Sequence, residues 1–406
     1  MSLLLVLVML VLGATKAGSG GAATLPAAPQ SLALLTSQVS AYAGALGPYK
    51  DGTWTTSNTL CWACNQGGPA TAAATLYMLT GKTQPNLLRE AEGTVDSAIA
   101  THQRPDGAFA GPPGDPQSPE VATMFFGVEE GNIYLELSPV LDRVRRARWQ
   151  ASIAAAASYL IGHGNLTWYT SGNINLGNAE LFYLAGKATG SAAFVRAYRQ
   201  ALSFAISPPQ RRWSGRGLVI VRQPTRADGS DGTGYLTETG AGGTGYDAEY
   251  TQLQLDVASR LYLLSGDPQV LRLSNLLVNM LLPRISSSFM LNTGGGTRHT
   301  EARREVPLIT SAFAVLGLHG GRADLVPLIL PALAALQRTY ADPINDYGEV
   351  YRRALGSDVS VIALAAEGPG APSQPDGRAA HAAPPLTHGK WHTHRRHRRH
   401  RRGKRW

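Results

Sequence analysis

Apolar residues recur at helical spacing through most of this chain. Val270, Leu273, Leu277 and Leu281 fall three or four positions apart, and this interval places side chains on one face of an α-helix. Alternation typical of strands is nearly absent, and its clearest case is the run 218–221. Residues 24–366 contain no Pro/Ser-rich linker and are long enough to bury one large core. The sequence therefore predicts a single, almost wholly α-helical domain over residues 24–366.

One helix ending recurs along this domain. An apolar last turn is followed by glycine four times, at Gly81, Gly186, Gly266 and Gly320. Glycine suits the left-handed cap that ends many helices, and a partner helix is predicted to start soon after each. The expected starts are Asn86, Ser191, Asp267 and Ala323. The unequal spacing of the four glycines argues against a regular solenoid, so we expect a series of antiparallel helical hairpins.

Further helices complete this series. A fifth hairpin is predicted from Val121–Leu137 and Val140–Ile161, and single helices are expected near 32–46 and 358–366. Together these make about twelve helices of ordinary length.

Long glycine-rich connections separate the predicted hairpins. They span 49–54, 104–119, 162–177, 222–245 and 292–305. Connections of this length in a compact domain usually carry function, and these contain aromatic, amide and acidic residues. The sequence therefore places candidate functional residues in the connections.

The hairpins and connections resemble the (α/α) toroids of carbohydrate-active enzymes, chiefly the alginate lyase and heparinase II/III-like lyases and the six-hairpin glycosidases. The run 168–175 is similar to the asparagine-bearing loop of the lyases, and 228–229, 235–238 and 245–250 are similar to the stretch that carries their catalytic tyrosine. Asp51–Trp54 and Asp106–Phe109 look like the Asp-Gly-x-aromatic loops of both groups. One departure is that Asn173 and Asn175 are not followed by the histidine that the lyases often place there. The resemblance implies an all-α (α/α)n toroid, either incomplete or with six hairpins, whose loops on one face bind a polysaccharide.

Lyase chemistry would require three kinds of group. A uronate carboxylate must be neutralised, a proton removed from C5, and the leaving oxygen protonated. Residue type and loop position suggest Asn173 and Asn175 as neutralising groups, Tyr246 or Tyr250 as base and acid, and His163, Arg298 and His299 as assistants. Further substrate-binding candidates are Trp54, Phe109, Trp168, Tyr169 and Asp247.

Hydrolysis is the first alternative, since it needs two carboxyl groups at a suitable separation. The candidates for such a pair are Glu129, Glu238, Asp247 and Glu249. A non-catalytic glycan-binding or wall-associated helical domain is the second alternative. Plainer roles compete with these: Asn173 as a helix cap, Tyr250 as a core residue, and Glu238 and Glu249 as solvated side chains. No cofactor and no metal are expected.

Cys61 and Cys64 are the only cysteines. A structural disulfide is predicted because the chain is expected in an oxidising compartment, and free thiols are the alternative. A metal site would need further ligands at a matching spacing, and the sequence has no second Cys or His pair of that kind.

The two ends differ from the domain between them. Residues 1–23 combine an apolar block too short to span a bilayer with small residues, which predicts a signal peptide and a secreted or cell-wall-associated protein. Residues 367–406 hold ten basic and two acidic residues, and residues 1–366 hold 27 basic and 26 acidic residues. Such a tail is predicted to be disordered. We expect it to bind an anionic cell-wall polymer or a membrane surface and no specific nucleic acid, with the protein a monomer.

Overall fold

The structure is a computed structural model that describes residues 48–55, 61–167 and 171–340, with side chains described as far as residue 335. The chain divides into two compact units, Met1–Ser373 and Gln374–Trp406, and every described residue belongs to the first. The predicted signal peptide, the helices near 32–46 and 358–366, Trp168, Tyr169 and the tail lie outside the described residues.

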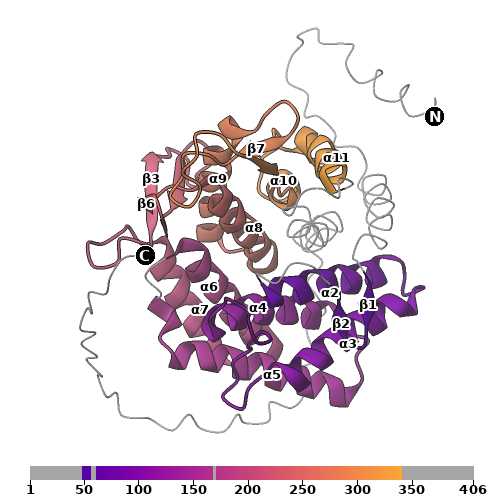
Figure 1. Cartoon of the computed structure of the whole chain (residues 1–406). Coiled ribbons are helices and arrows are strands. Elements are labelled where there is room, and N and C mark those ends of the chain that lie inside the picture. The colour runs from indigo at the N-terminus through magenta and orange to yellow at the C-terminus, as the bar shows by residue number, and fades with distance from the viewer. Residues whose placement is uncertain (1–47, 56–60, 168–170, 341–406) are drawn as a thin grey trace, which may run out of the picture. The chain divides into compact units, whose positions relative to one another are not determined.

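Ten α-helices form five consecutive hairpins in the described part of the chain (Figure 1). Their bounds are α2 (Trp62–Leu79), α3 (Pro85–Thr101), α4 (Pro119–Leu137), α5 (Arg143–Gly162), α6 (Gly172–Thr189), α7 (Ala192–Ile206), α8 (Ala248–Ser265), α9 (Pro268–Leu281), α10 (Ser311–Leu318) and α11 (Ile329–Tyr340). Short 3-10 helices lie at η2 (Asn165–Thr167), η3 (Leu282–Arg284) and η4 (Val326–Leu328). The even-numbered helices also pack against one another in order, from α2 to α10. They form an inner row, and each odd-numbered helix covers its partner from outside.

Burial of the helices follows this division. Nearly every residue of α2 and α6 is buried, whereas α7 and α9 bury one apolar stripe each, as expected for helices that face solvent on one side. The inner helices approach closely through small residues. A Cβ atom at Gly131 of α4 would lie 2.9 Å from Leu184 Cβ of α6, closer than packed carbon atoms tolerate.

The connections between helices are of two kinds. Four of the five that lead from an inner to an outer helix are short, as at 190–191 and 266–267, and the fifth, 319–328, contains η4. Those that lead into α4, α6, α8 and α10 span 102–118, 163–171, 207–247 and 282–310. The residues of the long connections therefore collect at the N-terminal ends of the inner helices.

Short hairpins of strand occupy much of these connections, where the sequence predicted irregular loops. Four two-stranded antiparallel sheets are described: β1 (Tyr49–Lys50) with β2 (Thr53–Trp54), β3 (Leu218–Arg222) with β4 (Thr233–Leu236), β5 (Glu238–Gly240) with β6 (Gly243–Gly245), and β7 (Met290–Asn292) with β8 (Glu305–Pro307). The predicted strand at 218–221 is confirmed as β3, which pairs Leu218 with Leu236.

The predicted helix ends are correct in part. Gly266 caps α8 with φ of 65°, as its position predicted. At Gly186 the prediction is wrong, because α6 continues to Thr189 and Gly190 provides the left-handed cap with φ of 69°. Gly186 instead allows α7 to approach α6: a Cβ atom there would lie 3.1 Å from Val195 Cγ2. At the fourth predicted helix ending, after α10, the glycine with positive φ is Gly321 rather than Gly320.

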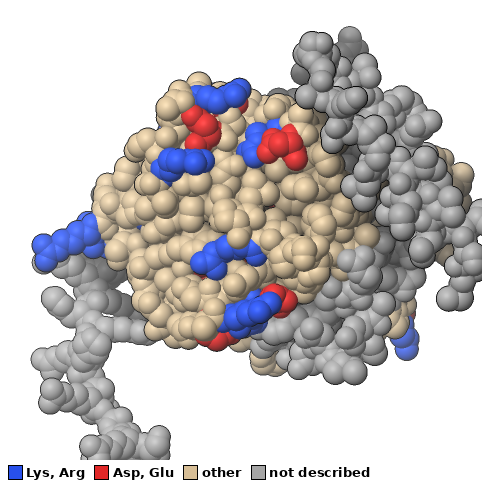
Figure 2. Space-filling model, turned by 90° about the horizontal axis from the view of Figure 1, so that it is seen from above, with Lys and Arg blue, Asp and Glu red and all other residues tan. Residues whose placement is uncertain are grey.

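One face of the described chain carries few charged groups, and these are of both signs (Figure 2). Figure 2 shows separate groups of basic and acidic side chains on a largely uncharged face. No helix in the described ranges is long and apolar enough to cross a membrane.

Glu130 of α4 is a fully buried carboxyl group that no basic residue neutralises among the described contacts. Burial raises the pKa of Glu130 to about 8, and the Ser152 hydroxyl alone opposes this shift. The folded protein therefore keeps Glu130 protonated at a pH where the unfolded chain, with a pKa near 4.5, has lost that proton. Stability should fall as pH rises from about 4.5 to about 8.

We predict that Glu130→Gln removes this loss of folding stability at rising pH. The variant should gain stability over the natural protein by an amount that grows from pH 5 to pH 8, on the order of 4 kcal/mol at the upper end. Urea unfolding at several pH values measures this, with Glu120→Gln in the first turn of the same helix as the control. Equal pH dependence in the natural protein and in Glu130→Gln would contradict the prediction.

Candidate active site

Glu238 is the buried centre of a polar cluster at the N-terminal ends of α6 and α8. It is the first residue of β5 and is 0% exposed. Its Oε1 accepts hydrogen bonds from the Asn173 backbone N–H at 2.9 Å and from Gln254 Nε2 at 2.8 Å. Burial raises the pKa of Glu238 to about 7, although these donors and Arg298 oppose the shift. The carboxyl group is thus held where it changes protonation near neutral pH.

Arg298, in the connection between β7 and β8, places a positive charge beside Glu238. Its Nη2 donates to Ser171 Oγ at 3.0 Å and lies 3.5 Å from Glu238 Oε2. The guanidinium carbon sits 4.1 Å from the centre of the Tyr250 ring, a cation–π arrangement. The side chain keeps 31% of its area exposed. Arg298 is therefore held on three sides and can still reach a ligand.

Asp247 joins α8 to the same connection. It caps α8 by accepting the Tyr250 N–H at 3.1 Å, and its other oxygen accepts the N–H groups of Arg298 at 2.8 Å and His299 at 3.2 Å. The side chain is 0% exposed. The Asp247 carboxylate is therefore occupied by backbone donors, and contact of Asp247 with substrate stays a prediction.

His299 lies between two carboxylates. Its Nδ1 is 3.4 Å from Asp247 Oδ1, and its Nε2 is 3.2 Å from Glu249 Oε2. The side chains of His299 and Glu249 remain 13% and 15% exposed. The His299 ring stacks with Tyr250 at a centroid distance of 6.4 Å, so the imidazole and the phenol face the same region.

The two candidate tyrosines differ in their surroundings. Tyr250 lies under Arg298, whereas Tyr246 packs against Tyr235 at 5.2 Å and under Arg284 at 5.0 Å. Burial raises the pKa of Tyr246 to about 12 and also raises the pKa of Tyr250. The charge of the neighbouring arginine lowers each tyrosine pKa, but desolvation outweighs it.

The two candidate asparagines lie in the first turn of α6. That helix begins at Gly172 with Ser171 at its N-cap, so the alternative in which Asn173 caps the helix is wrong. Asn173 is 8% exposed and Asn175 only 1% exposed. The Asn175 side chain donates to the Ser171 carbonyl at 2.9 Å. Only Asn173 is joined directly to Glu238.

Several other candidates lie outside this cluster. Trp54 is 3% exposed and donates from Nε1 to Thr94 at 3.0 Å, and Phe109 is 0% exposed and packs against Phe126 at 4.8 Å. Both rings therefore belong to the core in this structure, and their binding of substrate stays a prediction. The exposed His163 packs its ring on Tyr159 of its own helix at 3.9 Å.

Glu129, a candidate carboxyl for hydrolysis, belongs to a separate polar group among the inner helices. Its Oε2 accepts from Thr71 at 2.5 Å. Arg260 and Glu180, which form a buried bidentate ion pair at 2.6 and 2.9 Å, influence its pKa. Glu129 therefore does not pair with Glu238.

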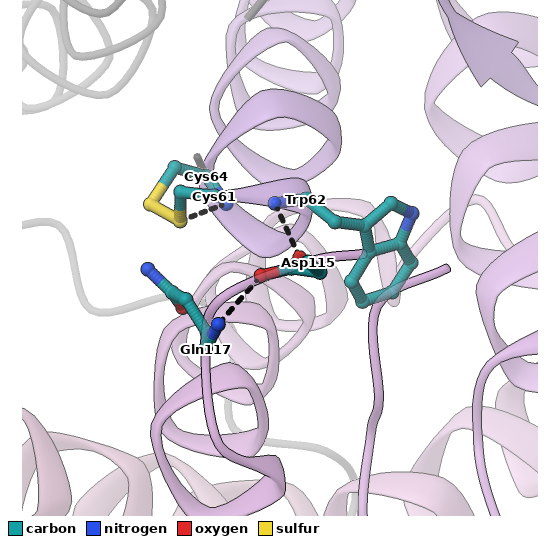
Figure 3. Close-up of a disulfide and its surroundings, with 5 residues drawn as sticks. All are labelled: Cys61, Trp62, Cys64, Asp115 and Gln117. Atoms are coloured by element: carbon teal, nitrogen blue, oxygen red, sulfur yellow. Dashed lines mark hydrogen bonds between the residues drawn. A yellow bond between two sulfur atoms is a disulfide. The ribbon is translucent and has the colours of Figure 1, made fainter. Parts of the chain in front are cut away.

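Cys61 and Cys64 form a disulfide at the start of α2 (Figure 3). Cys61 is the N-cap, and its Sγ accepts the Cys64 N–H at 3.1 Å. Asp115 accepts the Trp62 N–H at 2.9 Å with one oxygen and the Gln117 N–H at 2.8 Å with the other. The disulfide and Asp115 together fix the helix start against the connection that leads to α4.

Sequence analysis missed Ser171 and Gln254, which both face the cluster. Gln254 is 0% exposed between the apolar residues of α8, and a polar residue inside an apolar helical run is a signal that could have identified it. Ser171 has no comparable signal, because its role depends on Arg298, which is 127 residues away in the chain.

Buried polar atoms without a hydrogen-bond partner occur at several places in the described chain, among them both Glu130 oxygens, and one group of them belongs to the segments that meet at Glu238. This group includes Asn173 Oδ1, Asn175 Oδ1, Thr237 Oγ1, Tyr246 Oη, Gln254 Oε1, Thr297 Oγ1 and Arg298 Nε. Each such atom costs about 1–3 kcal/mol in a folded protein, so their concentration in one place is typical of a binding site rather than of a packed core. Among the described residues, no group of three or more His, Cys, Asp or Glu side chains is arranged to hold a metal ion.

No protein-family model matches the sequence, and no curated protein matches it. Solved structures match it in shape. D-mannose isomerase superposes with a TM-score of 0.54 at 11% identity, over 84% of this chain and 99% of the isomerase. A family 76 glycoside hydrolase (mannosidase) from Bacteroides thetaiotaomicron gives 0.49 at 11% identity, over 82% and 98% of the two chains. Unsaturated glucuronyl hydrolase from Streptococcus agalactiae gives 0.41 at 13% identity, over 82% and 77%.

The match to the isomerase shows the fold. The chain is an (α/α)6 toroid, and the predicted fold class is confirmed. Five of the hairpins lie within the ranges that the structure describes.

We predict that Arg298→Gln raises the pKa of Glu238 above about 7, because the positive charge of Arg298 holds that pKa down against burial. Infrared titration of the carboxyl C=O band, assigned with Glu238→Gln, measures the shift. Arg303→Gln is the matched control, since Arg303 lies in the same connection and pairs with Glu305 at the surface. The same Glu238 titration in both arginine variants would contradict the prediction.

Proposed function

We propose that this chain is a carbohydrate-active enzyme that cleaves a uronate-containing polysaccharide by β-elimination. The observation that carries the proposal is the convergence of Arg298, Tyr250, His299 and Glu249 beside the buried Glu238. These residues come from three separate parts of the sequence. The fold shared with D-mannose isomerase supports a sugar as the substrate.

Arg298 is the group that would bind the uronate carboxylate. Its guanidinium is partly exposed, and Ser171, Glu238 and the Tyr250 ring fix its orientation. A guanidinium pairs well with a carboxylate and stabilises the charge that develops when the neighbouring C–H bond breaks. In this role Glu238 positions Arg298 and does not itself meet the substrate, which agrees with its complete burial.

His299 and Glu249 would accept the proton from C5. They are partly exposed, and each offers a nitrogen or oxygen lone pair on the side of the cluster that a ligand can reach. Tyr250 would then protonate the leaving oxygen, because burial raises its pKa and keeps the phenol protonated. Base and acid thus occupy adjacent positions on one side of Arg298.

Hydrolysis is the second candidate function, and one observation favours it. The raised pKa of Glu238, about 7, suits a general acid, with Glu249 as the second carboxyl group. The complete burial of Glu238 counts against direct contact with a glycosidic oxygen. We therefore place elimination first.

Incubation with alginate, pectate and glycosaminoglycans tests the proposal. Elimination produces an unsaturated uronate with ultraviolet absorbance and a new reducing end in equal amounts, whereas hydrolysis produces reducing ends alone. D-mannose is included as a further substrate, with formation of ketose as the readout. We predict that Arg298→Gln and His299→Gln each lower the rate by at least about 100-fold.

Arg303→Gln should retain activity, because its side chain faces solvent and Glu305. Absence of any product from every substrate, with a folded protein, would contradict an enzymatic role and favour the glycan-binding alternative.

We also propose that the protein is exported through residues 1–23 and that residues 367–406 bind an anionic polymer or membrane surface. The ten basic residues against two acidic ones in the tail support this. Binding of the full chain and of a chain ending at 366 to purified cell wall tests it, and the tail-dependent part should weaken as salt is raised.

A further inference from the structure

Asp247 differs from the other aspartates that cap helices in this protein. Asp142 accepts two N–H groups of its own helix α5, at 2.8 and 2.9 Å. Asp267 accepts one N–H of its own helix α9 and the Tyr198 hydroxyl. One oxygen of Asp247 accepts an N–H of α8, and the other accepts the backbone N–H groups of Arg298 and His299, which lie 51 and 52 residues away in the chain. A cap alone does not require this second set of bonds.

The same carboxylate faces the His299 ring. The buried Nδ1 of His299 has no hydrogen-bond partner among the described residues, and the Asp247 Oδ1 atom lies 3.4 Å from it. The two backbone bonds to Asp247 hold the main chain of residues 298 and 299 beside this carboxylate, and the His299 ring extends from that fixed point. A negative oxygen at this position favours a proton on Nδ1.

The opposite nitrogen meets a different environment. Nε2 lies 3.2 Å from Glu249 Oε2, which in turn is 3.9 Å from Arg304 Nε. Glu301 and Tyr250 complete the ionisable neighbours of the ring. Glu249 is partly exposed, whereas Asp247 is completely buried. The two sides of the imidazole therefore differ in their access to a ligand.

We propose that Asp247 is a positioning residue that keeps one proton on Nδ1 of His299, so that Nε2 and Glu249 exchange the reaction proton. The proton that leaves the substrate carbon moves to Glu249 or Nε2, and Asp247 accepts none. This assignment rests on the proposed function for the reaction proton only. The location of the Nδ1 proton can be measured without any substrate.

Nitrogen-15 NMR of the histidine ring in the full chain tests the assignment. The His299 signal is identified by its loss in His299→Gln. We predict that the neutral ring of the natural protein carries its proton on Nδ1. Asp247→Asn should move a measurable fraction of that proton to Nε2, because the amide removes the negative charge. Glu249→Gln should leave the proton on Nδ1, and Asp142→Asn controls for the loss of a cap carboxylate elsewhere.

A neutral His299 that carries its proton on Nε2 in the natural protein would overturn the assignment. This result needs no variant, so it holds even if Asp247→Asn fails to fold. An unchanged Nδ1 proton in a folded Asp247→Asn variant would overturn it as well. A proton on Nδ1 combined with no activity on any sugar would support the role of Asp247 and contradict the proposed function. Activity on a sugar combined with a proton on Nε2 would support the proposed function and contradict the role of Asp247.

Discussion

The close approach of α4 and α6 is the constraint on which the inner row of helices depends. Gly131 lies against Leu184 with no room for a side chain, so the two helix axes stand nearer than larger residues would allow. A polar group buried between helices packed this closely loses its contacts with solvent, and a partner within the row offsets that cost. The bidentate pair of Glu180 and Arg260 meets this requirement between α6 and α8. Packing and pairing together fix the positions of the inner helix ends.

Those helix ends determine where the chemistry lies. Asn173 in the first turn of α6 and Tyr250 in the first turn of α8 are held by the inner row, and the chain returns to them through Glu238 and Arg298. Asp247 links the helices to these connections, since it caps α8 and accepts a hydrogen bond from the backbone N–H of Arg298. The cluster is therefore rigid at its base, while its partly exposed members Arg298, His299 and Glu249 remain available for binding.

Sequence patterns predicted the helices well because the spacing of apolar residues is a local property. They also placed Glu238, Arg298 and His299 among the candidate residues, since unusual polar residues in glycine-rich connections have no packing role. Burial was not predictable from the sequence for Trp54 and Phe109, because it depends on Thr94 and Phe126 in other helices. The strands other than β3 were missed for a related reason: strands of two to four residues are too short for a period of two to stand out. The pairing of Ser171 with Arg298 required the complete fold.

The unequal lengths of the connections have a consequence for how this protein can change. Every short turn lies where inner helices lead outward, and there an added residue would disturb the packing of a hairpin. The segment 207–247 leaves and rejoins the helices at two fixed points, and it brings Glu238 as part of a compact pair of hairpins. Between those points it is tied to the helices, since the Thr237 carbonyl accepts the Gly172 N–H of α6 at 3.0 Å and the Ser230 carbonyl accepts the Asn279 amide of α9 at 2.9 Å. A change in the length of this segment would therefore act at once on the surroundings of Glu238 and on the packing of the helices that it joins.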